Sequence, residues 1–140
     1  MPVAEPPEHR RWGSLEVRLP VAPQAPSMAR AAILNEIADR VTPETLEDAR
    51  LLASELVTNS VRHAGLSESD AITFRVAQRD HCVRVEVENA VAVFEVPTRE
   101  QWGEAVGTGW GLHLVARLAD RWGVDSDTRT IVWFELRDRT

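Results

Sequence analysis

Two short stretches of this sequence carry residue types that could do phosphate chemistry. In the first, Glu55, Asn59 and His63 follow one another at four-residue intervals, which places them on one side of a helix at the edge of its apolar arc. A carboxylate can act as a general base, and an amide oxygen is an acceptable ligand for Mg²⁺. The same side chains could instead cap neighbouring backbone groups, so the pattern alone leaves both interpretations open.

The second stretch is a glycine run, GTGWG at residues 107–111, directly before a predicted helix. Its alternate glycines (Gly107, Gly109 and Gly111) let the backbone approach a ligand closely. The start of a helix adds free N–H groups and a positive dipole end. The ligand class indicated is a phosphate, although glycines also serve ordinary tight turns.

Composition excludes several other chemistries. The chain of 140 residues carries a net charge of -6, and all 16 of its basic residues are arginine. Without lysine, a Walker-A site and a Schiff-base mechanism are impossible. A triphosphate would need another counter-charge, which Mg²⁺ could supply. The single cysteine, Cys82, excludes an intrachain disulfide and a cysteine-cluster metal site.

The net charge and the hydropathy also limit which partners the protein can have and where it can be located. A net acidic chain is a poor candidate for direct nucleic-acid binding, which depends on phosphate neutralisation. No run of about 18 apolar residues occurs, so we expect no membrane span, and a reduced, cytoplasmic protein is the default expectation.

The elements that must position these residues follow from hydrophobic periodicity. Alternation predicts strands over Trp12–Leu19, Ala71–Ala77, Val83–Val87, Trp122–Val124 and Thr130–Leu136. Helical spacing and capping residues predict helices over Ser27–Val41 (capped by Ser27), from Thr42 and Pro43 to about His63, and over Leu112–Ala119. Pro20 to Pro26 is predicted to be an extended connector, and residues 89–108 a long loop.

This order of elements predicts an α+β protein with helices packed on one face of a mixed, mostly antiparallel sheet. We expect one domain over residues 12–140. Residues 1–11 contain three prolines and are predicted to be a flexible N-terminal tail.

Taken together, the two stretches resemble the nucleotide-binding boxes of the GHKL (Bergerat-fold) ATPase superfamily. Residues 55–65, ELVTNSVRHAG, resemble its N box, and the glycine run looks like its second glycine box. Residues 118–124 (LADRWGV) and 130–136 (TIVWFEL) resemble the closing segment of one branch, the anti-sigma-factor serine kinases and their short regulatory relatives. The resemblance runs in matching order from Trp12 to Leu136 and implies a two-layer α/β sandwich.

The resemblance implies a function and a set of site residues. Glu55 would be the base that activates a serine hydroxyl, and Asn59 would coordinate Mg²⁺. The implied nucleotide site comprises Asn59, His63, Asn89, Gly107, Thr108, Gly109, Gly111 and Leu112. The protein would bind ATP with Mg²⁺ and act by partner switching, by holding a sigma factor, phosphorylating an anti-anti-sigma protein, or both. Arg30 would belong to the partner surface, on the helix that is also the dimer region of the family.

The first nucleotide-binding box departs from the family pattern. Asn89 stands where the family has the aspartate that accepts a hydrogen bond from the adenine amino group, and Val91 replaces a small residue. Glu88 precedes the position of the family's aspartate by one residue. On a strand, its side chain therefore points to the opposite face of the sheet. The alternative function is therefore a non-catalytic Bergerat-fold binding protein with weakened or lost nucleotide binding.

Overall fold

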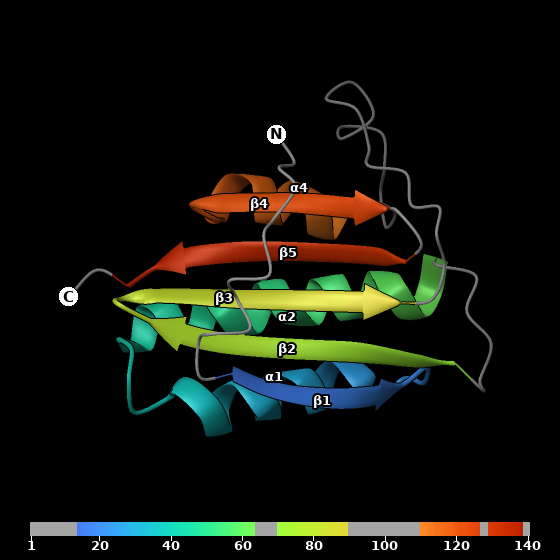
Figure 1. Cartoon of the computed structure of the whole chain (residues 1–140), viewed down its shortest axis with the longest axis horizontal. Coiled ribbons are helices and arrows are strands. Elements are labelled where there is room, and N and C mark those ends of the chain that lie inside the picture. Colours follow the sequence, from blue (N-terminus) through green and yellow to red (C-terminus); the bar gives the residue numbers. More distant parts are fainter. Residues whose placement is uncertain (1–13, 64–69, 90–109, 127–128, 139–140) are drawn as a thin grey trace.

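The computed structural model describes residues 14–63, 70–89, 110–126 and 129–138. In these ranges the strands are β1 (Ser14–Pro20), β2 (Ala71–Arg79), β3 (Cys82–Asn89), β4 (Arg121–Ser126) and β5 (Thr130–Arg137). The helices are α1 (Ala25–Ile37), α2 (Pro43–His63) and α4 (Trp110–Leu118). All three helices lie behind the sheet in Figure 1, so the molecule has two layers and the predicted α+β sandwich is confirmed.

The sheet has the strand order β1-β2-β3-β5-β4, and every pairing among these strands is antiparallel. Strands β2 and β3 are joined by a turn of two residues. Its two residues, Asp80 and His81, both have positive φ, 49° and 63°, as a two-residue hairpin requires when its twist matches the strands. The last strand of the chain, β5, lies inside the sheet between β3 and β4 (Figure 1).

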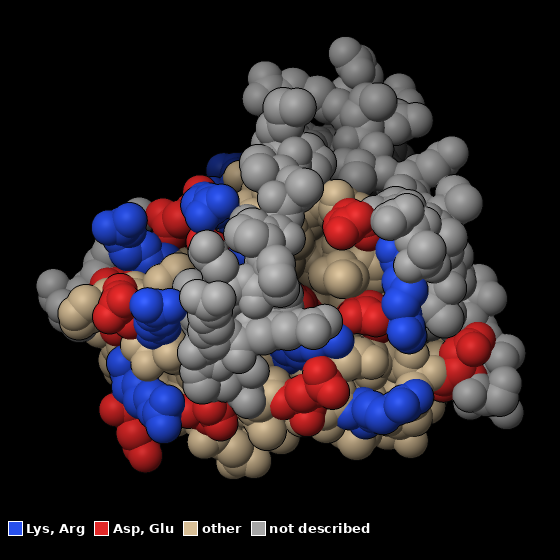
Figure 2. All heavy atoms as spheres, viewed as in Figure 1, with Lys and Arg blue, Asp and Glu red and all other residues tan. Residues whose placement is uncertain are grey.

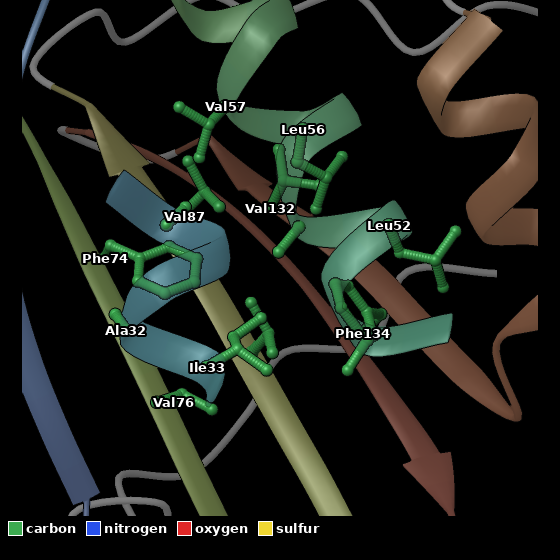
Figure 3. Packing of buried hydrophobic residues seen from close by; sticks show 14 of the residues in the cluster. Ala32, Ile33, Leu52, Leu56, Val57, Phe74, Val76, Val87, Val132 and Phe134 are labelled. Atoms are coloured by element: carbon green, nitrogen blue, oxygen red, sulfur yellow. The ribbon is translucent and has the colours of Figure 1, made fainter. Parts of the chain in front are cut away.

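The core lies between the sheet and the helices. Alternate residues of the three central strands point to the helical layer, namely Ile72, Phe74, Val76, Val83, Val85, Val87, Val132, Phe134 and Leu136. They meet the apolar sides of α1 and α2, and Figure 3 shows Ile33, Leu52, Leu56 and Val57 over this surface. Because burial of each large aliphatic side chain contributes about 1.5–3 kcal/mol, this interface fixes how α2 lies on the sheet.

The opposite, helix-free face of the sheet carries a chain of ion pairs. Arg75 on β2 bridges Glu16 on β1 (2.8 Å) and Glu88 on β3 (2.9 Å). Further along, Arg84 on β3 contacts Glu135 on β5 at 2.7 Å. Figure 2, which looks onto this face, shows both signs of charge interspersed along it.

Trp133 occupies the middle of the helix-free face and is only 2% exposed. The Arg84 guanidinium carbon lies 4.2 Å from the centroid of its ring, a cation–π distance. On the neighbouring strand the ring covers Gly123, where an added Cβ would come within 2.8 Å of the indole. A glycine is therefore required at this position of β4.

The start of α1 corrects two predictions. The helix begins at Ala25 with Gln24 as its N-cap and Pro26 in its first turn, a position that tolerates proline because no N–H bond is needed there. Ser27 lies inside the helix and its Oγ donates to the Gln24 carbonyl (2.9 Å), so the predicted Ser27 cap is wrong. Residues 21–24 form bends and turns and not an extended connector. The helix also ends earlier than predicted, at Ile37.

Helix α2 begins as predicted, with Thr42 before Pro43. The Thr45 amide donates to Thr42 Oγ1 at 3.4 Å and the Leu46 amide to the Thr42 carbonyl at 3.0 Å. By contrast, α4 begins at Trp110, two residues before the predicted start at Leu112. Gly111 therefore belongs to the first turn of the helix.

Several predictions fall outside the described residues: the tail of residues 1–11 and nearly all of the loop over residues 89–108. The single domain over residues 12–140 stays a prediction. None of the helices that the structure describes is both long and apolar enough to cross a bilayer.

Candidate functional site

The position of α2 along the sheet is set at its first turn. Asp138, directly after β5, accepts hydrogen bonds from the Thr42 amide (3.1 Å) and from the Thr42 hydroxyl (2.9 Å) through its Oδ1 atom. The helix rises about 1.5 Å per residue, so Asn59 lies about 25 Å beyond this anchor. The eight residues of β5 span about the same length, which brings Asn59 level with the Thr130 end of the sheet.

Figure 3 shows the same alignment from the apolar residues. Leu56 and Val57 of α2 lie over Val132 and Val87, two residues from the ends of β5 and β3 respectively. The N-box end of α2 therefore covers the edge where β3 ends and β5 begins.

Asn59 and Glu55 are two of the polar residues on the α2 side of this region, which also include the buried Ser60. Asn59 is buried, with 6% of its surface exposed, and Glu55 is half-buried. In the described part of the chain neither side chain forms a hydrogen bond or an ion pair. The simple alternative, that they cap backbone groups of the protein, is therefore not realised among these residues.

On the sheet side, Asn89 of β3 is directly opposite Thr130 of β5. Both side chains are buried, at 1% and 0% exposure, and both continue the alternation that points to the helical layer. Two neutral polar groups thus interrupt an apolar face next to Val87 and Val132. Thr130 was missed from the sequence, and the available signal was a threonine at an inward position of an apolar strand.

Glu88 lies on the other face of the sheet, as its register predicted. Its carboxylate pairs with Arg75 (2.9 Å) and with Arg129 (2.7 Å). It is consequently committed to the ion pairs of the helix-free face and cannot replace Asn89 at the helix–sheet interface.

The remaining predicted site residues are placed only in part. His63 is the last residue of α2, and Gly111 and Leu112 lie in the first turn of α4, but their side chains are not described. Gly107, Thr108 and Gly109 lie outside the described residues, as does Val91. Arg30 is half-buried on α1, remote in sequence from the polar cluster on α2.

Two further observations concern nucleophilic catalysis and metal binding by the described residues. Burial raises the pKa of the Cys82 thiol to about 11, so this thiol stays protonated near neutral pH and is a poor nucleophile. No group of three or more His, Cys, Asp or Glu residues able to hold a metal occurs within the described ranges.

The polar side chains gathered here, which we call the polar cluster, are of the chemical types that a nucleotide with Mg²⁺ requires. Asn59 offers a hard oxygen ligand, Glu55 offers a carboxylate one helical turn away, and Asn89 with Thr130 offers neutral donors and acceptors suited to the edge of a base.

Most of the chain matches a known sequence family. Residues 20–136 match the sequence family described as the histidine kinase-like ATPase domain. Similar relatives include the serine-protein kinase RsbW of Listeria monocytogenes and that of Listeria innocua, each 33% identical over 90 residues. The match covers 62% of this chain and 57% of each relative, so it spans little more than half the length of these kinases.

Proposed function

The chain belongs to the histidine kinase-like ATPase domain family, and from this premise we propose that it binds ATP with Mg²⁺ and phosphorylates a serine of a regulatory protein partner. Nucleotide binding would take place where α2 covers the ends of β3 and β5. The relatives reported above are named serine-protein kinases, which supports the choice of reaction.

The observation that carries the proposal is the state of Asn59. Asn59 is only 6% exposed and has no hydrogen bond with any described residue. Its amide is not among the described polar atoms that are closed off from solvent without a partner, so it stays accessible to a ligand. Glu55, one turn earlier, is half-buried and equally without a partner in this part of the chain.

The residues divide the work as follows. Asn59 would hold Mg²⁺ through its side-chain oxygen, and the metal supplies neutralisation of the phosphate charge. Glu55 would accept the proton of the serine hydroxyl while the serine oxygen forms its bond to the γ-phosphorus, the bond to the bridging oxygen breaks, and ADP leaves. Such transfer depends on positioning and charge more than on covalent catalysis by the protein.

Asn89 and Thr130 would contact the base. An aspartate offers only acceptors, whereas an asparagine offers both a donor and an acceptor and can be flipped. The paired side chains could therefore satisfy the edge of adenine or that of guanine. We expect weak ATP binding with poor discrimination against GTP.

The proposed partner is a sigma factor, an anti-anti-sigma protein, or both in turn, with a second copy of the chain as a further option. The surface proposed for it is α1. Arg30 is half-buried there, and two large apolar residues of the same helix, Met28 and Leu34, are 39% and 42% exposed. Exposed apolar residues beside a charged one are typical of surfaces that bind other proteins.

One observation favours the alternative function, a binding protein without catalysis. A neutral amide at Asn89 makes a weaker hydrogen bond than the charged carboxylate of the family, by a factor of roughly two in strength. If that loss is not compensated, the fold and the partner surface would remain while nucleotide binding is lost.

Isothermal calorimetry with ATP, with and without Mg²⁺, tests the proposal. Wild-type protein should bind ATP·Mg, and Asn59→Ala should weaken that binding but barely alter binding of magnesium-free ATP. Equal loss in both conditions would remove the metal-ligand role from Asn59. Failure of the wild-type protein to bind either form would establish the alternative in place of the kinase.

A further inference from the structure

A small cavity opens between the start of α2 and the end of α4, away from the polar cluster. Its volume is about 80 Å³, and its lining includes Glu44 and Asp48 of α2, Leu118 of α4, Asp120 and Arg137. Glu44, Asp48, Leu51 and Glu55 follow each other at spacings of four, three and four residues. They therefore lie on one side of α2, and we call them the α2 stripe.

The two carboxylates that α2 contributes to this cavity make no ion pair within the described part of the chain. Glu44 and Asp48 make no ion pair there, and neither does Arg137, the one basic residue among those lining the cavity. Burial, together with repulsion from Glu44 and Glu47, raises the pKa of Asp48 above 3.8. Two carboxylates are thus held close together without a cation between them.

Helix stability does not explain Asp48. Acidic residues stabilise a helix near its N-terminus, but the effect falls off within the first turn. Asp48 is the sixth residue of α2 counted from Pro43, and aspartate is a weak helix former. A residue that costs stability in the free protein is expected where a binding partner uses it.

Apolar surface lies beside these carboxylates. Leu51 in the α2 stripe and Leu118 in the cavity lining are each 42% exposed. The surface therefore combines negative charge with exposed aliphatic side chains, and it lies on the side of α2 that also carries Glu55.

We propose that this surface docks the substrate segment that carries the acceptor serine. The segment presents an arginine or a lysine to Glu44 and Asp48, and an aliphatic side chain to Leu51 and Leu118. Asp48 precedes Glu55 by seven residues, about 10 Å along the helix. In an extended segment, at about 3.3 Å per residue, the basic residue then lies about three positions from the serine. This inference rests on the proposed function, since it takes Glu55 as the point of transfer.

The test is binding of the full chain, without nucleotide, to a positional-scanning library of ten-residue peptides with serine fixed near the centre. Arginine or lysine about three positions from the serine should raise binding at least fivefold over glutamine at the same position. This preference should fall below twofold in the double variant Glu44→Gln/Asp48→Asn, because the charges that select it are gone. Leu51→Asn should weaken binding of all peptides while the preference for a basic residue persists.

A matched control removes two charges from another surface. Glu16→Gln/Asp80→Asn alters exposed carboxylates of β1 and the β2–β3 turn and should leave the preference unchanged. The double variant on α2 relieves repulsion, so its melting temperature should equal or exceed that of the wild type, which checks folding. A library without a basic preference, or a preference that survives Glu44→Gln/Asp48→Asn, would overturn the inference.

The proposed function is scored separately on the same proteins. Neither double variant alters Glu55, Asn59 or Asn89, so calorimetry with ATP·Mg should give the wild-type affinity in both. Loss of ATP binding in all proteins would count against the kinase, while the peptide result alone decides the docking surface.

Discussion

At the scale of single residues, Glu55 and Asn59 stand out because their side chains have no hydrogen bond or ion pair with the described residues. Polar side chains at a helix–sheet interface normally find partners within the protein, and these two find none among the described residues. Their roles can be separated experimentally, because a base acts on the rate whereas a metal ligand acts on binding.

Replacing Glu55 by glutamine should lower transfer of radiolabelled phosphate from ATP to a protein substrate by about 10²–10⁴-fold, the usual contribution of a general base. The affinity for ATP·Mg, measured by calorimetry, should stay within a few fold. Glu16→Gln on β1, at an exposed carboxylate, is the matched control and should leave both quantities unchanged. Transfer at the wild-type rate by Glu55→Gln protein would exclude Glu55 as the base.

Replacing Asn89 by aspartate should tighten ATP binding by about tenfold and favour ATP over GTP. The reason is that a carboxylate makes a stronger, charge-assisted bond to the adenine amino group and repels the O6 atom of guanine. Competition calorimetry with the two nucleotides measures both effects. Wild-type protein that already binds ATP tightly and ignores GTP would contradict the role given to Asn89.

At the scale of elements, the link between β5 and α2 depends on one carboxylate. Asp138 bonds Thr42 at the start of α2, and its own amide donates to the His81 carbonyl of the β2–β3 turn (2.6 Å). Burial acts to raise the pKa of Asp138, but hydrogen bonds from Thr42 and Thr45 outweigh it, so the pKa lies below 3.8. The ionised form is therefore the one that the folded state prefers.

Asp138→Asn should lower the free energy of unfolding at pH 7 by about 1 kcal/mol, the usual cost of a lost helix cap. Because the folded pKa lies below the unfolded value, the contribution is complete above about pH 4 and is lost as the pH falls through the folded pKa. Urea unfolding of both proteins from pH 7 to pH 2.5 measures this. The two curves should converge at the acid end, and a constant difference would contradict the ionised cap. Asp39→Asn, at an exposed position, is the control.

The elements predicted from sequence are those with a strong local pattern. Alternation placed every strand, and Thr42 with Pro43 marked the start of α2. The start of α1 was misplaced because the prolines from Pro20 to Pro26 locally favour an extended backbone. Pro26 in fact lies in the first turn of the helix. Thr130 and Asp138 were missed for another reason: their partners, Asn89 and Thr42, are far away in sequence, and no local period reports such pairs.

At the scale of the whole molecule, the helix-free face acts as a single unit. Arg84 is 3% exposed and contacts Glu86 (2.9 Å), Glu135 (2.7 Å) and the face of Trp133. Removing one member of a buried ion pair leaves the other charge uncompensated, which is costly. The side-chain contacts between β3 and β5 therefore depend on this guanidinium.

Arg84→Met should lower the free energy of unfolding by about 3 kcal/mol, because Glu86 and Glu135 lose their closest and most buried partner among the described residues. They keep Arg75 and Arg121, each at 3.3 Å. Arg79→Met provides the comparison. Its ion pair with Asp80 is largely exposed, with side-chain exposures of 54% and 87%, so the loss should stay below about 1 kcal/mol. Chemical unfolding of the two variants measures both changes in the free energy of unfolding. Equal decreases in Arg84→Met and Arg79→Met would show that the ion pairs of this face do not act together.

The central place of β5 also governs when the protein can become functional during its synthesis. Strands β3 and β4 each pair with β5 and not with each other, so a ribosome-bound chain that has exposed only the first four strands cannot close the sheet. The Asn89–Thr130 pair and the Asp138 anchor of α2 arise together, when β5 joins the sheet. Because domains fold as their segments emerge, a nascent chain should gain affinity for nucleotide abruptly, once β5 has left the exit tunnel. Stalled intermediates that lack this strand should bind none.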